Sequence, residues 1–95
     1  LPKFPAVTRD LAVVCDKAMP VLSLEKEIQT AVGKNLENIS LFDVYEGNQI
    51  ENGKKSVAFS LKLRSKDKSL TDDDADSAMK KAVKAIEKLG ATLRS

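Results

Sequence analysis

The residues from 56 to 64 alternate without interruption between apolar side chains and small or polar ones. The apolar positions are Val57, Phe59, Leu61 and Leu63, and the alternating positions are Ser56, Ala58, Ser60, Lys62 and Arg64. Because successive side chains of a strand point to opposite faces of a sheet, this pattern predicts a strand with one buried face. The fold is thereby constrained to a sheet that is covered on one side and open on the other.

Two further strands are predicted near the ends of the chain. Leu11, Val13 and Cys15 alternate with small or polar residues and indicate an N-terminal strand that also has one buried face. Residues 91–94 can form a short closing strand.

The segment from residue 36 to residue 45 is also expected to be a strand, but its apolar positions do not keep one alternation. We therefore expect a bulge near Leu41-Phe42. If Phe42 and Val44 point inward, Asp43 and Tyr45 point outward.

Two segments have the spacing of amphipathic helices. After Pro20, Ser23 is expected to cap the first helix and Gly33 to end it; Thr71 is expected to cap the second and Gly90 to end it. The apolar residues at helical spacing are Leu24, Ile28, Ala31 and Val32 in the first segment, and Ala75, Ala78, Met79, Ala82, Val83, Ile86 and Leu89 in the second.

The predicted order is strand, helix, strand, strand, helix, strand. This order is typical of an α+β fold of the ferredoxin-like βαββαβ type, with an antiparallel four-stranded sheet and two helices on one face. Residues 1–8, which contain Pro2 and Pro5, are expected to form an extended N-terminal segment, and residues 9–95 the folded domain. Alternation assigns these positions to the open face: Asp10, Ala12, Val14, Ser56, Ala58, Ser60 and Arg94, with Asp43 and Tyr45 under the condition above.

Length and composition indicate one globular domain with a mild charge. The chain has 95 residues, sixteen basic and fourteen acidic, for a net charge of +2. Any nucleic-acid contact is therefore expected to be led by shape more than by charge. The absence of an initiator Met and of a leader predicts a piece of a larger cytoplasmic protein, and the single Cys15 agrees with a reducing compartment. No apolar run is long enough to predict a membrane helix.

No set of residues suggests catalysis. The chain has no histidine, which excludes His-based triads and His metal sites. Cys15 is interpreted as a buried apolar residue, with a reactive thiol as the alternative. The run Asp72-Asp73-Asp74 is interpreted as the acidic first turn of a helix, with a metal cluster as the alternative. The glycines stand singly, so the sequence contains no glycine-rich phosphate loop.

Five motifs in order give the chain a family resemblance. They are FPAVTRDLAVV at 4–14, LFDVYEG at 41–47, KKSVAF at 54–59, SLTD at 69–72 and GATLR at 90–94. Together they resemble the C-terminal ferredoxin-like anticodon-binding domain of the bacterial phenylalanyl-tRNA synthetase beta subunit. Lys68 and Ser69 depart from the arginine and threonine that are common in the family, so a bidentate guanidinium contact is not expected there.

The resemblance implies that the domain binds the anticodon stem-loop of tRNA(Phe) with its open sheet face and does no chemistry itself. The partners it implies are the remainder of the beta subunit and the alpha subunit of a cytoplasmic alpha2beta2 enzyme, which uses ATP and Mg²⁺ outside this domain. Tyr45 and Arg94 are expected to stack on unpaired bases. The RNA-binding positions carried over are Arg9, Asp10, Ala12, Asp43, Tyr45, Ser56, Ala58 and Arg94; no catalytic, cofactor or metal residue is assigned.

Other interpretations remain open from the residues alone. Tyr45 can instead close the edge of the core, and Arg94 can pair with Asp10 or Asp43. The basic residues at 54–68 and on the second helix are typical of solvated faces, with phosphate contact as the alternative. A different function on the same plan is a regulatory or assembly module of the ACT type, which binds small amino acids. An enzyme of the acylphosphatase type is disfavoured because no glycine-rich anion loop is present.

Overall fold

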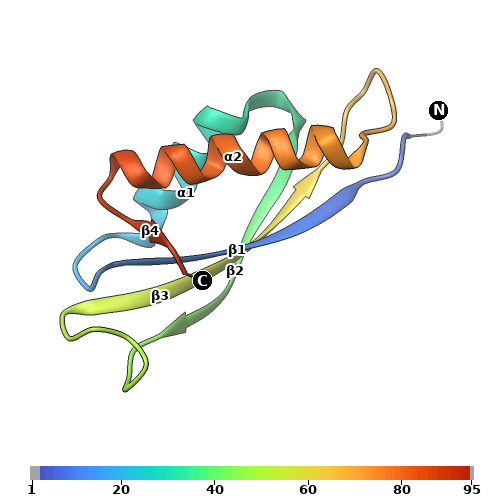
Figure 1. The fold of residues 1–95 in the computed structure, drawn as a ribbon. Coiled ribbons are helices and arrows are strands. Elements are labelled where there is room, and N and C mark those ends of the chain that lie inside the picture. Colours follow the sequence, from blue (N-terminus) through green and yellow to red (C-terminus); the bar gives the residue numbers. More distant parts are fainter. Residues whose placement is uncertain (1–2, 95) are drawn as a thin grey trace.

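The described part of the chain, residues 3–94 of a computed structural model, forms one antiparallel sheet with two helices on one face (Figure 1). The elements are β1 (Val7–Asp16), α1 (Val21–Val32), a short 3-10 turn η1 (Gly33–Asn35), β2 (Leu36–Tyr45), β3 (Lys54–Leu63), α2 (Asp72–Lys88) and β4 (Thr92–Leu93). The strands lie in the spatial order β2-β3-β1-β4. The predicted α+β βαββαβ fold is confirmed.

The sheet is built around the pairing of β1 with β3. Their register runs from Val7 opposite Leu63 to Asp16 opposite Lys54 without a break. Because paired residues share a face, the large apolar residues that alternate along the two strands, Leu11 and Val13 with Val57 and Phe59 for example, lie together on the side of the helices. Those that become fully or almost fully buried are Leu11, Val13, Cys15, Val57, Phe59, Leu61 and Leu63.

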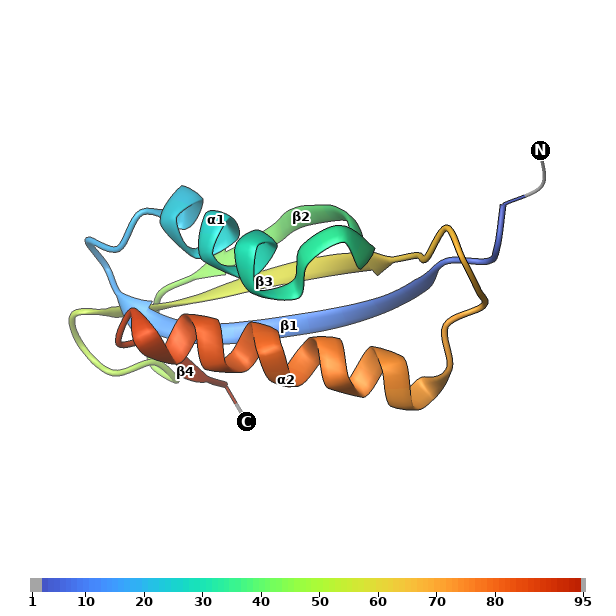
Figure 2. The same cartoon turned by 90° about the horizontal axis from the view of Figure 1, so that it is seen from above.

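The helices cover this apolar side of the sheet (Figure 2). α1 contributes Leu24, Ile28 and Val32 to the core, and α2 contributes Ile86 together with small residues. The small residues of α2 that are buried are Ala75, Ala82 and Ala85. Short side chains let the backbone of α2 lie close to its neighbours. Because these residues and Ile86 are buried, the apolar stripe predicted for α2 is confirmed.

The caps of α1 and α2 differ. The predicted Ser23 cap is wrong: α1 begins at Val21 after Pro20, with no side-chain cap, and the Ser23 N–H donates to the Pro20 carbonyl at 3.1 Å inside the first turn. Pro20 occupies the N-cap position with extended backbone, and its side chain has no atom that could accept a hydrogen bond from the first turn. Thr71 does cap α2, and Gly90 follows its end with a φ of 85° as predicted.

β2 is an edge strand with two irregularities in its pairing to β3. The register shifts between Leu36 and Asn38 and between Leu41 and Asp43, which confirms the predicted bulge. The condition that Phe42 points inward is not met, because this residue sits at the bulge and is 58% exposed. Val44 lies opposite Val57, on the side of the helices, yet it is 45% exposed because an edge strand is only partly covered.

The N-terminal boundary of the sheet differs from the predicted one. β1 begins at Val7, inside the expected 1–8 segment, because Val7 and Thr8 pair with the last residues of β3. Pro2 lies outside the described residues. The described residues before Val7 form no helix or strand.

We predict that Phe59→Ala lowers the free energy of unfolding by about 3–5 kcal/mol, because the ring is fully buried and its loss leaves a cavity. The matched control is Phe42→Ala, which removes the same ring from an exposed site and is expected to cost less than about 1 kcal/mol. Urea unfolding of both variants measures the difference. Equal losses would contradict the assignment of the two faces.

The α2 cap predicts a specific pH dependence. Asp74 Oδ2 accepts from the Thr71 backbone N–H at 2.9 Å, and Lys68 Nζ lies 3.0 Å from the same oxygen. These contacts, that of Thr71 first, hold the pKa of Asp74 below its ordinary value. Because the pKa of Asp74 is lower in the folded than in the unfolded chain, ionised Asp74 contributes its full stabilisation at a pH above the unfolded pKa. This contribution is lost as the pH falls through the folded pKa.

We therefore expect the stability difference between the parent chain and Asp74→Asn to be constant near neutral pH and to shrink below about pH 4. Asp73→Asn is the control, since Asp73 lies in the same first turn without being part of the capping box. Thermal unfolding at stepped pH measures both. A difference for Asp74→Asn that persists undiminished at the lowest pH would refute the coupling.

Candidate functional site

The side of the sheet that faces away from the helices has a floor of small side chains. The register places Asp43 of β2 opposite Ala58 of β3, and Ala58 opposite Ala12 of β1. The next row consists of Tyr45, Ser56 and Val14. Both alanines are half-buried, so this face has no bulky side chain at its centre.

An arginine that follows β4 reaches across this floor. The Arg94 backbone N–H donates to the Ala12 carbonyl at 2.9 Å, which places the residue at the end of β4 on the open face. Its Nη1 donates to Ser56 Oγ at 3.1 Å, and its guanidinium carbon lies 5.8 Å from the centroid of the Tyr45 ring. Its Nη2 also lies 3.5 Å from Gln49 Oε1. We call Tyr45, Ser56, Arg94 and Gln49 the Tyr45–Arg94 cluster.

The cluster resolves two alternatives that the sequence left open. Arg94 pairs with neither Asp10 nor Asp43 among the described residues; its partners are Ser56, Gln49 and the Tyr45 ring. Tyr45 is on the open face and partly exposed, so it does not close the core. Three of the predicted site residues, Tyr45, Ser56 and Arg94, are therefore brought into contact from three separate parts of the chain.

The loop between β2 and β3 forms one wall of this site. Ile50 is buried, and its N–H donates to the Gly47 carbonyl at 3.0 Å, so the loop folds back on itself and onto the domain. Gln49, Val14 and Arg94 line a shallow pocket of about 390 Å³ beside it. Gln49 was not predicted from the sequence as a site residue, because the turn residues around Gly47 do not determine how a loop of this length folds.

Gly47 is required where the loop begins. A Cβ atom added at this position would lie 2.5 Å from the Tyr45 hydroxyl oxygen and 2.9 Å from Cζ of the ring. Only the absence of a side chain lets the ring take its place against the loop. The position of Tyr45 is thus set both by Gly47 and by Arg94.

Arg9 is the one predicted site residue that lies elsewhere. It is opposite Leu61, on the side of the helices, and its Nη2 is 3.4 Å from Asp72 Oδ1 at the start of α2. Its assignment to the open face came from the motif and is wrong, since its alternation with Leu11 places it on the covered side. Its guanidinium instead pairs with a carboxylate in the first turn of α2.

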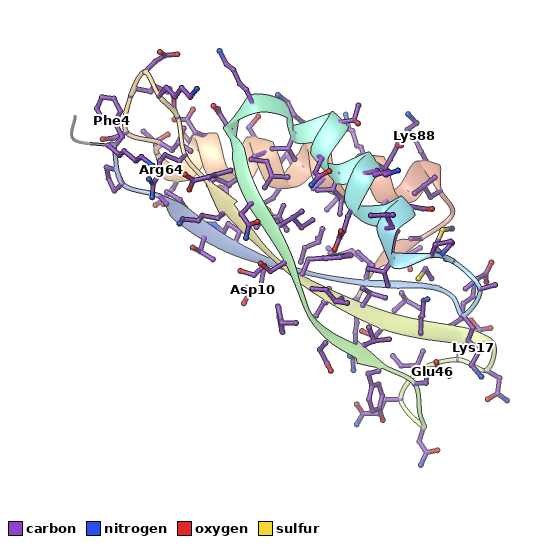
Figure 3. All side chains as sticks on the ribbon, turned by 180° about the vertical axis from the view of Figure 1, so that it is seen from behind. Phe4, Asp10, Lys17, Glu46, Arg64 and Lys88 are labelled. Atoms are coloured by element: carbon purple, nitrogen blue, oxygen red, sulfur yellow. The ribbon has the colours of Figure 1, made fainter. Side chains whose placement is uncertain are left out.

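Asp10 and Asp43 do lie on the open face, as expected, and both are exposed. Figure 3 shows Asp10 projecting away from the helices. Carboxylates accept hydrogen bonds from base amino groups or sugar hydroxyls and repel phosphates. The centre of the face is therefore better suited to bases and sugars than to a phosphate backbone.

Most lysines around β3 are occupied within the domain. Lys54 Nζ donates to Asp16 at 2.9 Å, Lys68 lies 3.0 Å from Asp74, and Lys62 lies 3.5 Å from Glu37. Lys55 is buried and donates to the Met19 carbonyl at 2.6 Å. These contacts agree with the interpretation of the basic residues around β3 as structural and solvated charge.

The residues that suggested other chemistry have structural roles. Cys15 is buried, and burial raises the pKa of its thiol in spite of nearby Lys55, so the unreactive protonated form is favoured. Asp74 belongs to the α2 cap. Within residues 3–94, no three His, Cys, Asp or Glu side chains are grouped as a metal site. No helix in this range is long and apolar enough to cross a bilayer.

Four antiparallel strands with two helices on one face, in the order βαββαβ, define the class of ferredoxin-like α+β domains. The chain belongs to the family described as "Ferredoxin-fold anticodon binding domain", whose family model matches residues 2–94.

Its relatives are described as "Phenylalanine--tRNA ligase beta subunit". The protein from Clostridium acetobutylicum is 46% identical over 95 residues, which cover 99% of this chain and 12% of that protein. The protein from Bacillus subtilis is 47% identical over 87 residues, which cover 92% of this chain and 11% of that one. The chain therefore spans about an eighth of the length of the relatives that it matches.

Solved structures with the same fold are more distant in sequence. A cryo-EM structure of wild-type MSL1 from Arabidopsis thaliana superposes with a TM-score of 0.62 at 13% identity, over 99% of this chain and 33% of that one. At this identity the likeness concerns the fold alone.

We predict that Gly47→Ala displaces the Tyr45 ring while leaving stability nearly unchanged, because the clash is with the tip of a flexible side chain. Tyr45 is the only tyrosine and there is no tryptophan, so intrinsic fluorescence reports on this ring alone. Acrylamide quenching of Gly47→Ala is expected to differ from that of the parent chain, whereas Asn48→Ala is expected to match it. Identical quenching in all three proteins would show that Gly47 does not position the ring.

Proposed function

We propose that the open face binds the anticodon loop of tRNA(Phe), as one domain of a phenylalanine–tRNA ligase beta subunit. The observation that carries this proposal is the Tyr45–Arg94 cluster: a ring and a guanidinium held together at the edge of a floor of small residues. Membership of the anticodon-binding family and the relatives' description support it.

The geometry suits bases that are unstacked from a loop. The Tyr45 ring and the Arg94 guanidinium both offer planes on which a base stacks. The alanine floor at Ala12 and Ala58 leaves room for a flat ring, and Asp10 and Asp43 provide acceptors for base amino groups or 2′-hydroxyls. Recognition by stacking and by base edges is therefore favoured over recognition of phosphates at this site.

Binding by the domain alone is expected to be weak. The chain has a net charge of only +2, and the open face carries Asp10 and Asp43 beside Arg94. A dissociation constant of about 10⁻⁴ to 10⁻⁶ M at physiological salt is therefore expected. Other domains of the longer protein supply the rest of the tRNA affinity.

The chemistry of charging belongs, in this proposal, to other parts of the enzyme. No grouped metal ligands occur within residues 3–94, and the glycines stand singly, so these residues do not fit ATP or Mg²⁺. The domain contributes by holding the tRNA in register for the distant cytoplasmic alpha2beta2 catalytic centre. No specific contact among the described residues favours the ACT-type alternative.

We predict that Tyr45→Ala and Arg94→Ala each weaken binding of an anticodon stem-loop by roughly 5- to 150-fold, since a base stack contributes about 1–3 kcal/mol. Fluorescence anisotropy of a dye-labelled stem-loop measures binding to the parent chain and to each variant, because Tyr45→Ala removes the only tyrosine and with it the intrinsic signal. Leu22→Ala is the control, because Leu22 is exposed on α1, in the helical layer. An equal weakening in Leu22→Ala would mean that the sheet face is not the site.

In the full-length beta subunit assembled with its partner, the same two substitutions are expected to lower kcat/KM for tRNA while leaving the phenylalanine-dependent exchange of pyrophosphate into ATP nearly unchanged. The reason is that exchange does not need tRNA. If both activities fall together, the domain supports folding or assembly. If neither falls, the open face is not where the tRNA binds.

A further inference from the structure

A second pocket lies at the opposite end of the sheet from the Tyr45–Arg94 cluster. Its volume is about 430 Å³, and its lining includes Lys3, Phe4, Lys34, Glu37, Arg64 and Lys66. These residues come from the N-terminal segment, from the two sides of the η1–β2 junction and from the residues just after β3. Figure 3 shows Phe4 and Arg64 beside each other at this end of the molecule. We call this the basic pocket.

The charges of the basic pocket are not balanced. Four of its side chains are cationic and one is a carboxylate, and that carboxylate, Glu37, is shared with Lys62 at 3.5 Å. Lys3, Lys34 and Lys66 make no ion pair with any residue in the range 3–94. This contrasts with Lys54, Lys62 and Lys68, each of which has an acidic partner.

Arg64 has hydrogen-bonding capacity that the domain does not use. Its Nε is buried and has no partner among the described residues. Its Nη1 lies 3.6 Å from Glu37 Oε1, which is an ion pair but too long for a good hydrogen bond. A buried donor without an acceptor is costly, and a guanidinium fork matches the oxygens of a phosphate. A ligand oxygen at the pocket would supply the acceptor that these donors lack.

The basic pocket continues the open face. Arg64 follows Ser56, Ser60 and Lys62 in the alternation of β3, and Lys62 and Arg64 both reach the carboxylate of Glu37. Eight residues separate Ser56 from Arg64, which at about 3.3 Å per residue is about 26 Å.

We propose that the basic pocket binds a backbone phosphate in the stem of the RNA whose loop lies on the Tyr45–Arg94 cluster. The inference rests on the proposed function and adds a second anchor of different chemistry. The exposed carboxylates Asp10 and Asp43 between the two ends disfavour phosphates there, so the RNA is held by bases at one end and by its backbone at the other.

The test is the salt dependence of stem-loop binding. Lys34→Gln/Lys66→Gln removes two exposed charges from the pocket, and Lys80→Gln/Lys84→Gln removes two exposed charges from α2 as a matched control. Each phosphate contact that a variant abolishes is expected to reduce the slope of log affinity against log salt by about 0.7–0.9. The pocket variant is expected to show this reduction, with weaker binding at low salt, and the control to keep the parent slope.

Two further arms separate the possible failures. Tyr45→Ala is expected to weaken stem-loop binding without changing the slope of log affinity against log salt. If it does so while the pocket variant also keeps the parent slope, the phosphate contact at the basic pocket is refuted and binding at the open face is supported. Inorganic phosphate is titrated alone, with the amide signals of residues 34–37 and 64–66 followed by NMR. Shifts there without a slope change would mean that the pocket takes free phosphate, which overturns the RNA contact. If neither the parent chain nor any variant binds the stem-loop, the proposed function and this inference are both refuted.

Discussion

The unbroken pairing of β1 with β3 is the interaction on which the rest of the structure depends. The period of a strand is two, so a continuous register aligns the large apolar residues that alternate along both strands on one side. That side requires both helices to cover it, and the other side is left with alanine, serine and carboxylate side chains. The core and the open face are therefore two consequences of the same pairing.

The site is built from the edges of the sheet and not from its centre. β4 is only two residues long, yet the hydrogen bond from Arg94 to Ala12 extends its pairing far enough to aim the guanidinium across β1. On the other edge, the bulge at Phe42 changes the phase of β2, so that Tyr45 comes opposite Ser56. Small irregularities at the two edges thus bring an aromatic ring and a cation together beside the small side chains of the central strands.

The distribution of charge gives this small domain two kinds of surface. Ion pairs such as Lys54–Asp16 and Lys68–Asp74 occupy most of the basic residues near β3. Three lysines that have no acidic partner among the described residues, Lys3, Lys34 and Lys66, gather at the end where β2 begins and β3 ends. The low net charge of the whole chain conceals this separation, because the composition sums over both ends and the acidic face between them.

The sequence by itself determined the features that depend on local spacing: the strand faces at Phe59 and Val13, the α2 cap at Thr71, the bulge in β2, and the open side for Asp10, Ser56 and Arg94. Two predictions from local sequence were wrong. Ser23 does not cap α1, because Pro20 occupies the N-cap position, and Arg9 does not lie on the open face, because its alternation with Leu11 places it on the side of the helices. Only the tertiary structure decided that Arg94 meets Tyr45, Ser56 and Gln49, and that Arg64 joins Lys3 and Lys34. These partners lie far apart along the chain, and their meeting depends on strand register and loop folding, which no local pattern encodes.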